Sequence, residues 1–85
     1  MTHYSYRTKG TCSRMIDFDI EDGKLHDVSF VNGCDGNLKA IGKLVEGADA
    51  QETANILRGN LCGPRKTSCA DQLARAIDEA LAASA

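Results

Sequence analysis

Four cysteines carry the clearest chemistry in this chain, and each lies where a turn or an element boundary is expected. They are Cys12 in Lys-Gly-Thr-Cys-Ser, Cys34 in Asn-Gly-Cys-Asp-Gly, Cys62 in Asn-Leu-Cys-Gly-Pro and Cys69 in Thr-Ser-Cys-Ala-Asp. A cysteine kept only for packing normally lies on the apolar face of an element, and none of these does. Thiolates grouped in loops bind soft metals, form disulfides or take part in redox reactions.

The spacing of the cysteines does not choose among these chemistries. The chain has no Cys-x-x-Cys pair, and Cys62 and Cys69 are separated by more residues than in common zinc-finger patterns. His3 and His26 could add imidazole ligands, but a solvated histidine on a strand is the simpler interpretation of each.

Length and composition narrow the class of protein. Eighty-five residues predict a single domain, residues 1–85, with a modest core. The net charge of −2, with scattered Lys and Arg, argues against nucleic-acid binding. No apolar segment resembles a signal peptide or approaches the ~20 residues of a membrane span. We therefore expect a cytoplasmic protein without a membrane partner, whose cysteines serve metal or redox chemistry; a disulfide framework is the alternative.

Period-two alternation in the first third predicts three strands. Residues 3–8 place two tyrosines on one face, residues 16–20 alternate apolar side chains with Asp17 and Asp19, and a third strand spans Leu25 to Val31 with Val28 and Phe30 facing inward. Asp22-Gly23 supplies the positive φ angles of a tight hairpin.

Helical spacing follows from residue 38 onward. The first helix is expected just after Asp35 and Asn37, and a second starts at the capping box Asp49-x-x-Glu52. A third starts at about Ser68, which is its expected N-cap, with Asp71 three residues on in a capping role. The apolar positions expected in the core are Leu38, Ile41, Leu44, Val45, Ala54, Leu57, Leu73, Ala76, Ile77, Ala80 and Leu81.

These elements predict an α+β fold, a three-stranded antiparallel sheet followed by three helices packed on one face, in the order β-β-β-α-α-α. The antiparallel hairpin returns the chain to its starting edge, which places Cys12 and Cys34 at the same edge of the sheet. Cys34 and Cys69 are each expected at a helix start, where a thiol pKa is lowered.

The segments around Cys34, Cys62 and Cys69, above all Thr-Ser-Cys-Ala-Asp, resemble the TSCPD domain family over essentially the whole chain. Ala70 stands where the family name has Pro. The family includes small stand-alone proteins and a domain at the C-terminus of adenosylcobalamin-dependent ribonucleotide reductases. This chain has no reductase catalytic barrel, so the resemblance does not imply that it is an enzyme.

The chain is also distantly similar to iron–sulfur scaffold proteins of the NifU/IscU type, and the resemblance implies an IscU-like fold. Cys12, Cys34 and Cys69 correspond in order and context to the three scaffold cysteines. Arg14 and Ser68 stand where the scaffolds have Asp and His, and Cys62 is extra. A closed set of four thiolates would hold a metal tightly rather than hand over a cluster.

The leading hypothesis is a metal-binding module that holds zinc or an iron–sulfur cluster through Cys12, Cys34, Cys62 and Cys69. A second is a thiol-redox accessory protein that uses Cys62 and Cys69, with ribonucleotide reductase or another iron–sulfur or redox protein as partner. A third is an interaction domain with free cysteines, and a homodimer through the sheet would fit it.

Overall fold

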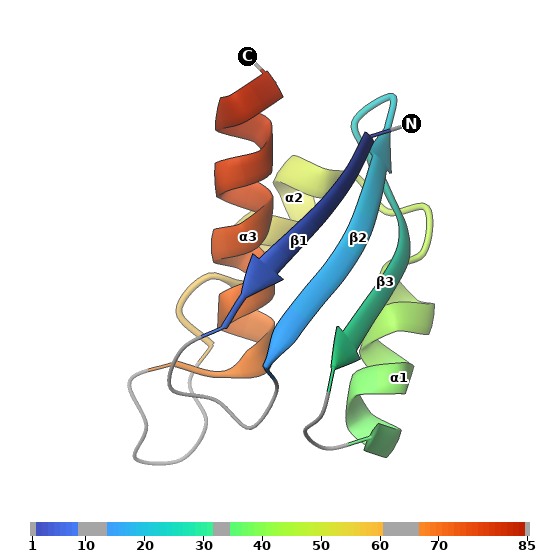
Figure 1. The fold of residues 1–85 in the computed structure, drawn as a ribbon, viewed down its shortest axis with the longest axis vertical. Helices are drawn as coiled ribbons and strands as arrows, with labels where there is room; N and C mark the ends of the chain where they lie inside the picture. The colour runs from blue at the N-terminus through green and yellow to red at the C-terminus, as the bar shows by residue number, and fades with distance from the viewer. Residues whose placement is uncertain (1, 9–13, 32–34, 61–66, 85) are drawn as a thin grey trace.

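The computed structural model describes residues 2–8, 14–31, 35–60 and 67–84 (Figure 1). Its elements are β1 (Thr2–Arg7), β2 (Met15–Glu21), β3 (Lys24–Val31), α1 (Asp35–Val45), α2 (Ala50–Leu57) and α3 (Cys69–Ser84). The three strands form one antiparallel sheet in the order β1-β2-β3. The predicted α+β fold and its β-β-β-α-α-α order are confirmed.

The β2–β3 hairpin forms at the predicted turn. Asp22 and Gly23 have φ angles of 53° and 75°. Positive φ at both central residues is characteristic of the tight turn whose twist matches that of the flanking strands. The hairpin register then pairs Ile16 with Phe30 and Met15 with Val31 at the far end of the sheet.

A β-bulge interrupts the alternation in β3. Ser29 pairs with Asp17 and His26 with Asp19, so two residues of β3, Asp27 and Val28, oppose Phe18 alone. Asp27 adopts a φ of 53°, and its amide donates to a carboxylate oxygen of Glu46 at 2.8 Å. Residues three positions apart in a regular strand face opposite sides of the sheet. The extra residue of the bulge places Leu25 and Val28 on the same side, where both are buried.

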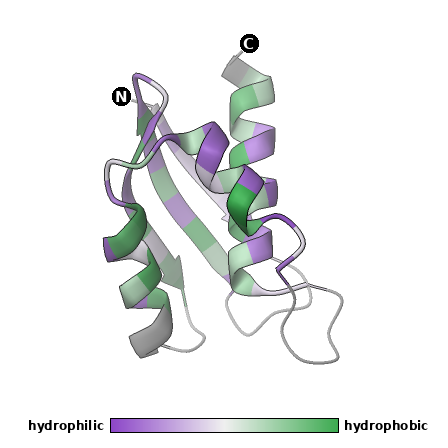
Figure 2. Cartoon of the chain, turned by 180° about the vertical axis from the view of Figure 1, so that it is seen from behind, coloured by the Kyte–Doolittle hydropathy of each residue, from purple (hydrophilic) through white to green (hydrophobic). Residues whose placement is uncertain are grey.

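The core lies between one face of the sheet and the helices. α2 packs beside α3, and α1 packs against β3 (Figure 2). The buried apolar cluster comprises Ile16, Phe18, Leu25, Val28, Ala50, Ala54, Leu73, Ala74, Ala76, Ile77 and Ala80. Most of the predicted core positions are therefore confirmed, with Ile41, Val45, Leu57, Phe30 and Leu81 packed at the margin of the cluster.

Helix α1 differs from its prediction in two respects. It begins at Asp35, so Asp35 and Asn37 lie within its first turn instead of before it. Leu44, expected in the core, is 82% exposed, because the sheet covers α1 only on the side of Leu38, Ile41 and Val45.

Close approach holds α1 to the sheet at Gly42. A β-carbon built at Gly42 would lie 2.6 Å from the carbonyl oxygen of Val28. The helix therefore packs against β3 at a distance that only glycine permits at this position.

The chain between α1 and α2 runs along the start of β3. The amide of Gly47 donates to the Leu25 carbonyl at 2.7 Å, and the Leu25 amide donates to Ala48 at 2.9 Å. Asp49 forms a bridge to Lys24 and then caps α2, where its carboxylate accepts from the Glu52 amide at 2.8 Å. The predicted N-cap at Asp49 is confirmed.

The ends of the elements give the molecule two distinct poles. The β2–β3 turn, the start of β1 and the end of α3 lie at one pole (Figure 1). The end of β1, the start of β2, the end of β3 and the starts of α1 and α3 lie at the opposite pole (Figure 1). We call the latter the cysteine pole, because Cys69 begins α3 there and each connection that contains Cys12, Cys34 or Cys62 starts from or leads into an element end at this pole.

Candidate functional site at the cysteine pole

Of the four predicted site residues, the structure describes Cys69. Cys12, Cys34 and Cys62 lie outside the described residues. The described residues on either side of each one mark the ends of the connection that contains it. On either side, at most four residues separate each of these three cysteines from a described position. The placement of those positions shows where each connection starts and finishes.

The connections that contain Cys12 and Cys34 leave from adjacent backbone. The Thr8 amide donates to the Arg14 carbonyl at 3.1 Å, and the Arg14 amide donates to the Val31 carbonyl at 2.7 Å. Cys12 lies between Thr8 and Arg14, and Cys34 lies between Val31 and the first residue of α1. The flanks of both cysteines therefore meet at the same edge of the sheet, as the antiparallel hairpin predicts.

Cys69 is presented by a helix start whose other residues are buried. Thr67, Ser68, Ala70 and Asp71 are 7%, 7%, 8% and 2% exposed, whereas Cys69 is intermediate. Ser68 is the N-cap of α3, as predicted, since its hydroxyl accepts from the Asp71 amide at 3.0 Å. Cys69 thus occupies the first position of α3 and is the partly exposed residue of this helix start.

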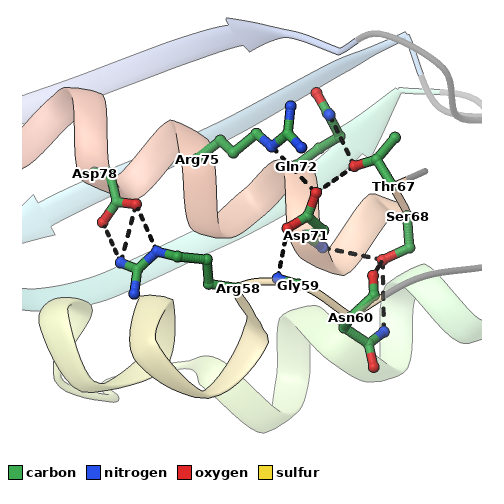
Figure 3. Close-up of polar contacts among 9 residues, drawn as sticks. All are labelled: Arg58, Gly59, Asn60, Thr67, Ser68, Asp71, Gln72, Arg75 and Asp78. Atoms are coloured by element: carbon green, nitrogen blue, oxygen red, sulfur yellow. Dashed lines mark hydrogen bonds and ion pairs between the residues drawn. The ribbon is translucent and has the colours of Figure 1, made fainter.

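Ser68 also joins the start of α3 to the end of α2. Its hydroxyl donates to the Asn60 carbonyl and lies 3.5 Å from the Asn60 side-chain amide (Figure 3). Asn60 is itself held on α2 by donation from its backbone amide to Leu57 at 3.0 Å. The connection that contains Cys62 therefore begins and ends at residues that are bonded to each other.

Asp71 makes a second junction at the same place. Its carboxylate accepts from the Gly59 amide at 2.7 Å and from the Thr67 hydroxyl, and it lies 3.1 Å from Nε of Arg75 (Figure 3). We call the contacts among Gly59, Asn60, Thr67, Ser68 and Asp71 the α2–α3 clasp. A buried carboxylate is stable here because several donors satisfy its oxygens.

The charge state of Asp71 follows from these contacts. Burial favours the neutral acid, but the Thr67 hydroxyl, the Gly59 amide and the Arg75 guanidinium outweigh it and hold the pKa of Asp71 below its usual value. Asp71 is therefore ionised at neutral pH. The sequence indicates only a capping role for Asp71, because its partner Gly59 lies in the turn after α2, which no local pattern links to Asp71.

The two histidines are engaged on the open face of the sheet. Nδ1 of His3 lies 2.7 Å from Asp19, and Nδ1 of His26 lies 2.8 Å from Glu46. These contacts agree with the interpretation of both as surface histidines. Within residues 2–8, 14–31, 35–60 and 67–84, no three His, Cys, Asp or Glu side chains gather closely enough to hold a metal ion.

A family model supplies the classification. The model of the TSCPD domain matches residues 1–81 of the 85. The chain belongs to the TSCPD domain family. In this TSCPD domain the motif that runs from Thr67 to Asp71 builds the helix start and the clasp, with Cys69 as its partly exposed member.

The structure also accounts for Ala70 in this TSCPD domain. Ala70 is the second residue of α3, and the amides of the first helical turn have no partner within the helix. Proline, which lacks this amide, and alanine are both compatible with such a position.

Searches of the curated proteins and of the solved structures gave no significant match to the chain. The similarity to the NifU/IscU scaffolds stays a prediction. Across the described part of this TSCPD domain, no helix has the length and apolar character that crossing a membrane requires.

Proposed function

We propose that this TSCPD domain is a small metal-binding module in which Cys12, Cys34, Cys62 and Cys69 together hold zinc or an iron–sulfur cluster. The supporting observation is that the described flanks of all four cysteines lie at one pole of the fold (Figure 1). Four thiolates suit tetrahedral zinc and also the common iron–sulfur clusters.

The chemistry of the pole supports the same proposal. A thiolate ligand has to be reached by the metal ion, and Cys69 is the partly exposed residue at the start of α3. A bound metal would add folding free energy to a domain of modest core. A cytoplasmic location, where thiols stay reduced, fits the proposal as well.

Elemental analysis with an absorbance spectrum tests the proposal. Protein purified anaerobically without chelator is expected to carry stoichiometric zinc, or iron with a visible absorbance band. Each of Cys12→Ser, Cys34→Ser, Cys62→Ser and Cys69→Ser is expected to lower the metal content. Ser29→Ala, an exposed position on β3, serves as the control and keeps it. Wild-type protein without zinc or iron would contradict the proposal.

A second candidate function is thiol redox chemistry by Cys62 and Cys69, in the service of ribonucleotide reductase or another iron–sulfur or redox protein. The α2–α3 clasp favours it, because the clasp joins Asn60, which precedes the connection that contains Cys62, to Ser68, which directly precedes Cys69. Thiol titration of the metal-free protein with and without reductant separates the two functions. A reversible disulfide in protein that never carries metal would favour redox chemistry.

A further inference from the structure

We propose that the outer edge of β1 docks an extended segment of a partner polypeptide, which joins the sheet as a fourth strand and presents a carboxylate to Arg7. Docking at this edge is independent of metal binding by the cysteines. β1 forms one edge of the three-stranded sheet, and β3 forms the other (Figure 1). The two edges differ in how the described chain uses their backbone groups.

The backbone groups that β1 turns outward belong to alternate residues. In an antiparallel pair, a strand points the amide and carbonyl of one residue toward its neighbour and those of the next residue away. Thr8 lies opposite Arg14 when the β1–β2 register is continued, and its amide donates to the Arg14 carbonyl at 3.1 Å. Thr8 therefore points toward β2. By alternation, the backbone groups of His3, Ser5 and Arg7 point away from the sheet.

The β2–β3 hairpin leads to the same assignment. Glu21 and Lys24 flank its two-residue turn and pair with each other, and the residues that close such a turn exchange a hydrogen bond. Glu21 thus points toward β3, so that Ile20 points toward β1, where it pairs with Thr2. Thr2 points inward in return, and His3, the next residue, points outward.

The three outward residues of β1 have unpaired backbone groups. No described residue forms a hydrogen bond with their outward amides or carbonyls. At the β3 edge, in contrast, the Leu25 amide donates to Ala48 and the Leu25 carbonyl accepts from Gly47. The chain therefore covers the start of one edge itself. A row of unpaired groups, as along β1, is the template to which an extended segment adds.

Addition of a strand to β1 requires no change in the core. The side chains of Tyr4 and Tyr6 already pack against the buried apolar cluster. The outward residues place their side chains on the opposite face of the sheet, because side chains alternate along a strand. Both faces of β1 can therefore keep their present contacts when the edge is paired.

Arg7 determines the charge of the partner. The side chains of His3 and Ser5 are each bonded to a carboxylate on β2. Arg7 instead pairs with Met15, which pairs in turn with Val31, so this row of the open face has no acidic side chain. Arg7 is exposed and forms no ion pair with a described residue. A carboxylate directly opposite Arg7 on an added strand would supply the missing cross-strand pair.

A second copy of the chain would not supply that carboxylate. When two β1 strands pair antiparallel through all of their outward residues, Ser5 lies opposite Ser5, and Arg7 lies opposite His3 of the other copy. The charge of Arg7 therefore favours a different polypeptide, one whose extended segment carries Asp or Glu.

The test uses a synthetic strand of defined sequence. It is a seven-residue capped peptide in which valine and threonine alternate, except that glutamate is the second residue. Added antiparallel to β1, it places the glutamate opposite Arg7, and its second, fourth and sixth residues bond to the edge. Two N-methylated forms differ only in the amides that they block. One blocks the fourth and sixth amides, which face β1, and the other blocks the third and fifth, which face away.

Binding is measured by NMR titration of the isotope-labelled full-length chain. The unmodified peptide is expected to shift the amide signals of His3, Ser5 and Arg7. Methylation of the fourth and sixth amides should weaken binding by about tenfold, because two hydrogen bonds are lost, whereas methylation of the third and fifth should not. Absence of binding by the unmodified peptide, or equal binding by the two methylated forms, would overturn the proposal.

Ser5→Pro and Ser5→Ala are a matched pair of variants. Both remove the hydroxyl that donates to Asp17, but only proline removes the outward amide. Ser5→Pro is expected to bind the peptide about tenfold more weakly, and Ser5→Ala to stay within about twofold of wild type. Equal binding by the two variants would count against the edge. If circular dichroism shows Ser5→Pro to be unfolded, the methylated peptides decide by the criteria above.

Arg7→Glu tests the charge of the partner. It is expected to weaken binding of the glutamate peptide by about fivefold and to strengthen binding of a peptide with lysine in the same position. A variant that does not distinguish the two peptides would overturn the acidic partner. Sedimentation of the wild type tests the other occupant, because a dimer that Ser5→Pro dissociates would assign the edge to a second copy. None of these readouts depends on metal content, so metal binding and edge docking fail separately.

Discussion

At the scale of single residues, two contacts depend on a backbone group that approaches a second element. Gly42 allows α1 to lie close to the Val28 carbonyl, and the Gly59 amide donates a hydrogen bond to the Asp71 carboxylate. Neither contact has a signal in the sequence, because each depends on where a second element lies. The four cysteines, in contrast, could be selected from the sequence by type and by their positions at turns.

Gly42→Ala is expected to destabilise the domain, although alanine is the better helix former. In an exposed helix the substitution would stabilise by about 1 kcal/mol. Here the new β-carbon would lie 2.6 Å from the backbone oxygen of Val28, so α1 or β3 must shift. Overpacking of this kind costs about 1–3 kcal/mol. Urea unfolding measures the difference, with the exposed Lys43→Ala as control. A gain in stability for Gly42→Ala would show that α1 and β3 are further apart.

At the scale of elements, sequence patterns predict best where the signal is local. The hairpin at Asp22-Gly23, the cap at Asp49 and the cap at Ser68 are each confirmed, because a turn or cap is specified by a few neighbouring residues. The bulge in β3 has no such local signal, because its positive φ belongs to Asp27 and a glycine, which would mark such a position, is absent there. The exposure of Leu44 was missed for a related reason: helical spacing alone does not reveal how wide a face the sheet covers.

Asp49→Ala is expected to lower the stability of the domain by about 0.5–2 kcal/mol, because the Glu52 amide loses its partner at the start of α2. Asp49→Asn is the matched control, since asparagine caps helices about as well as aspartate. Chemical denaturation followed by circular dichroism measures both. An equal loss for the two substitutions would show that the charge of Asp49, and not its cap, stabilises α2.

At the scale of the whole molecule, the β2–β3 turn lies at one pole and the described flanks of the cysteines lie at the other. The antiparallel order of the strands, which the alternation predicts, already brings the flanks of Cys12 and Cys34 together. The addition of Cys69 and of the described flanks of Cys62 to that pole could not be predicted. It depends on the direction in which α3 crosses the sheet and on contacts between the end of α2 and the start of α3 that no local pattern specifies.

Metal binding is therefore expected to protect one pole of the molecule from hydrogen exchange. Zinc should slow exchange at Arg14, whose amide is bonded to Val31, and in the first turn of α3. The turn at Asp22-Gly23, at the other pole, should exchange as before. Hydrogen–deuterium exchange with and without zinc, under conditions where both forms stay folded, measures this. Protection spread evenly over both poles would contradict a site at the cysteine pole.

The pole that holds the β2–β3 turn also holds the start of β1 and the end of α3 (Figure 1). Both ends of the polypeptide therefore emerge on the side remote from the cysteines. An affinity tag or a fused protein at either terminus would therefore extend from the pole opposite Cys69 and leave the approach to the start of α3 open.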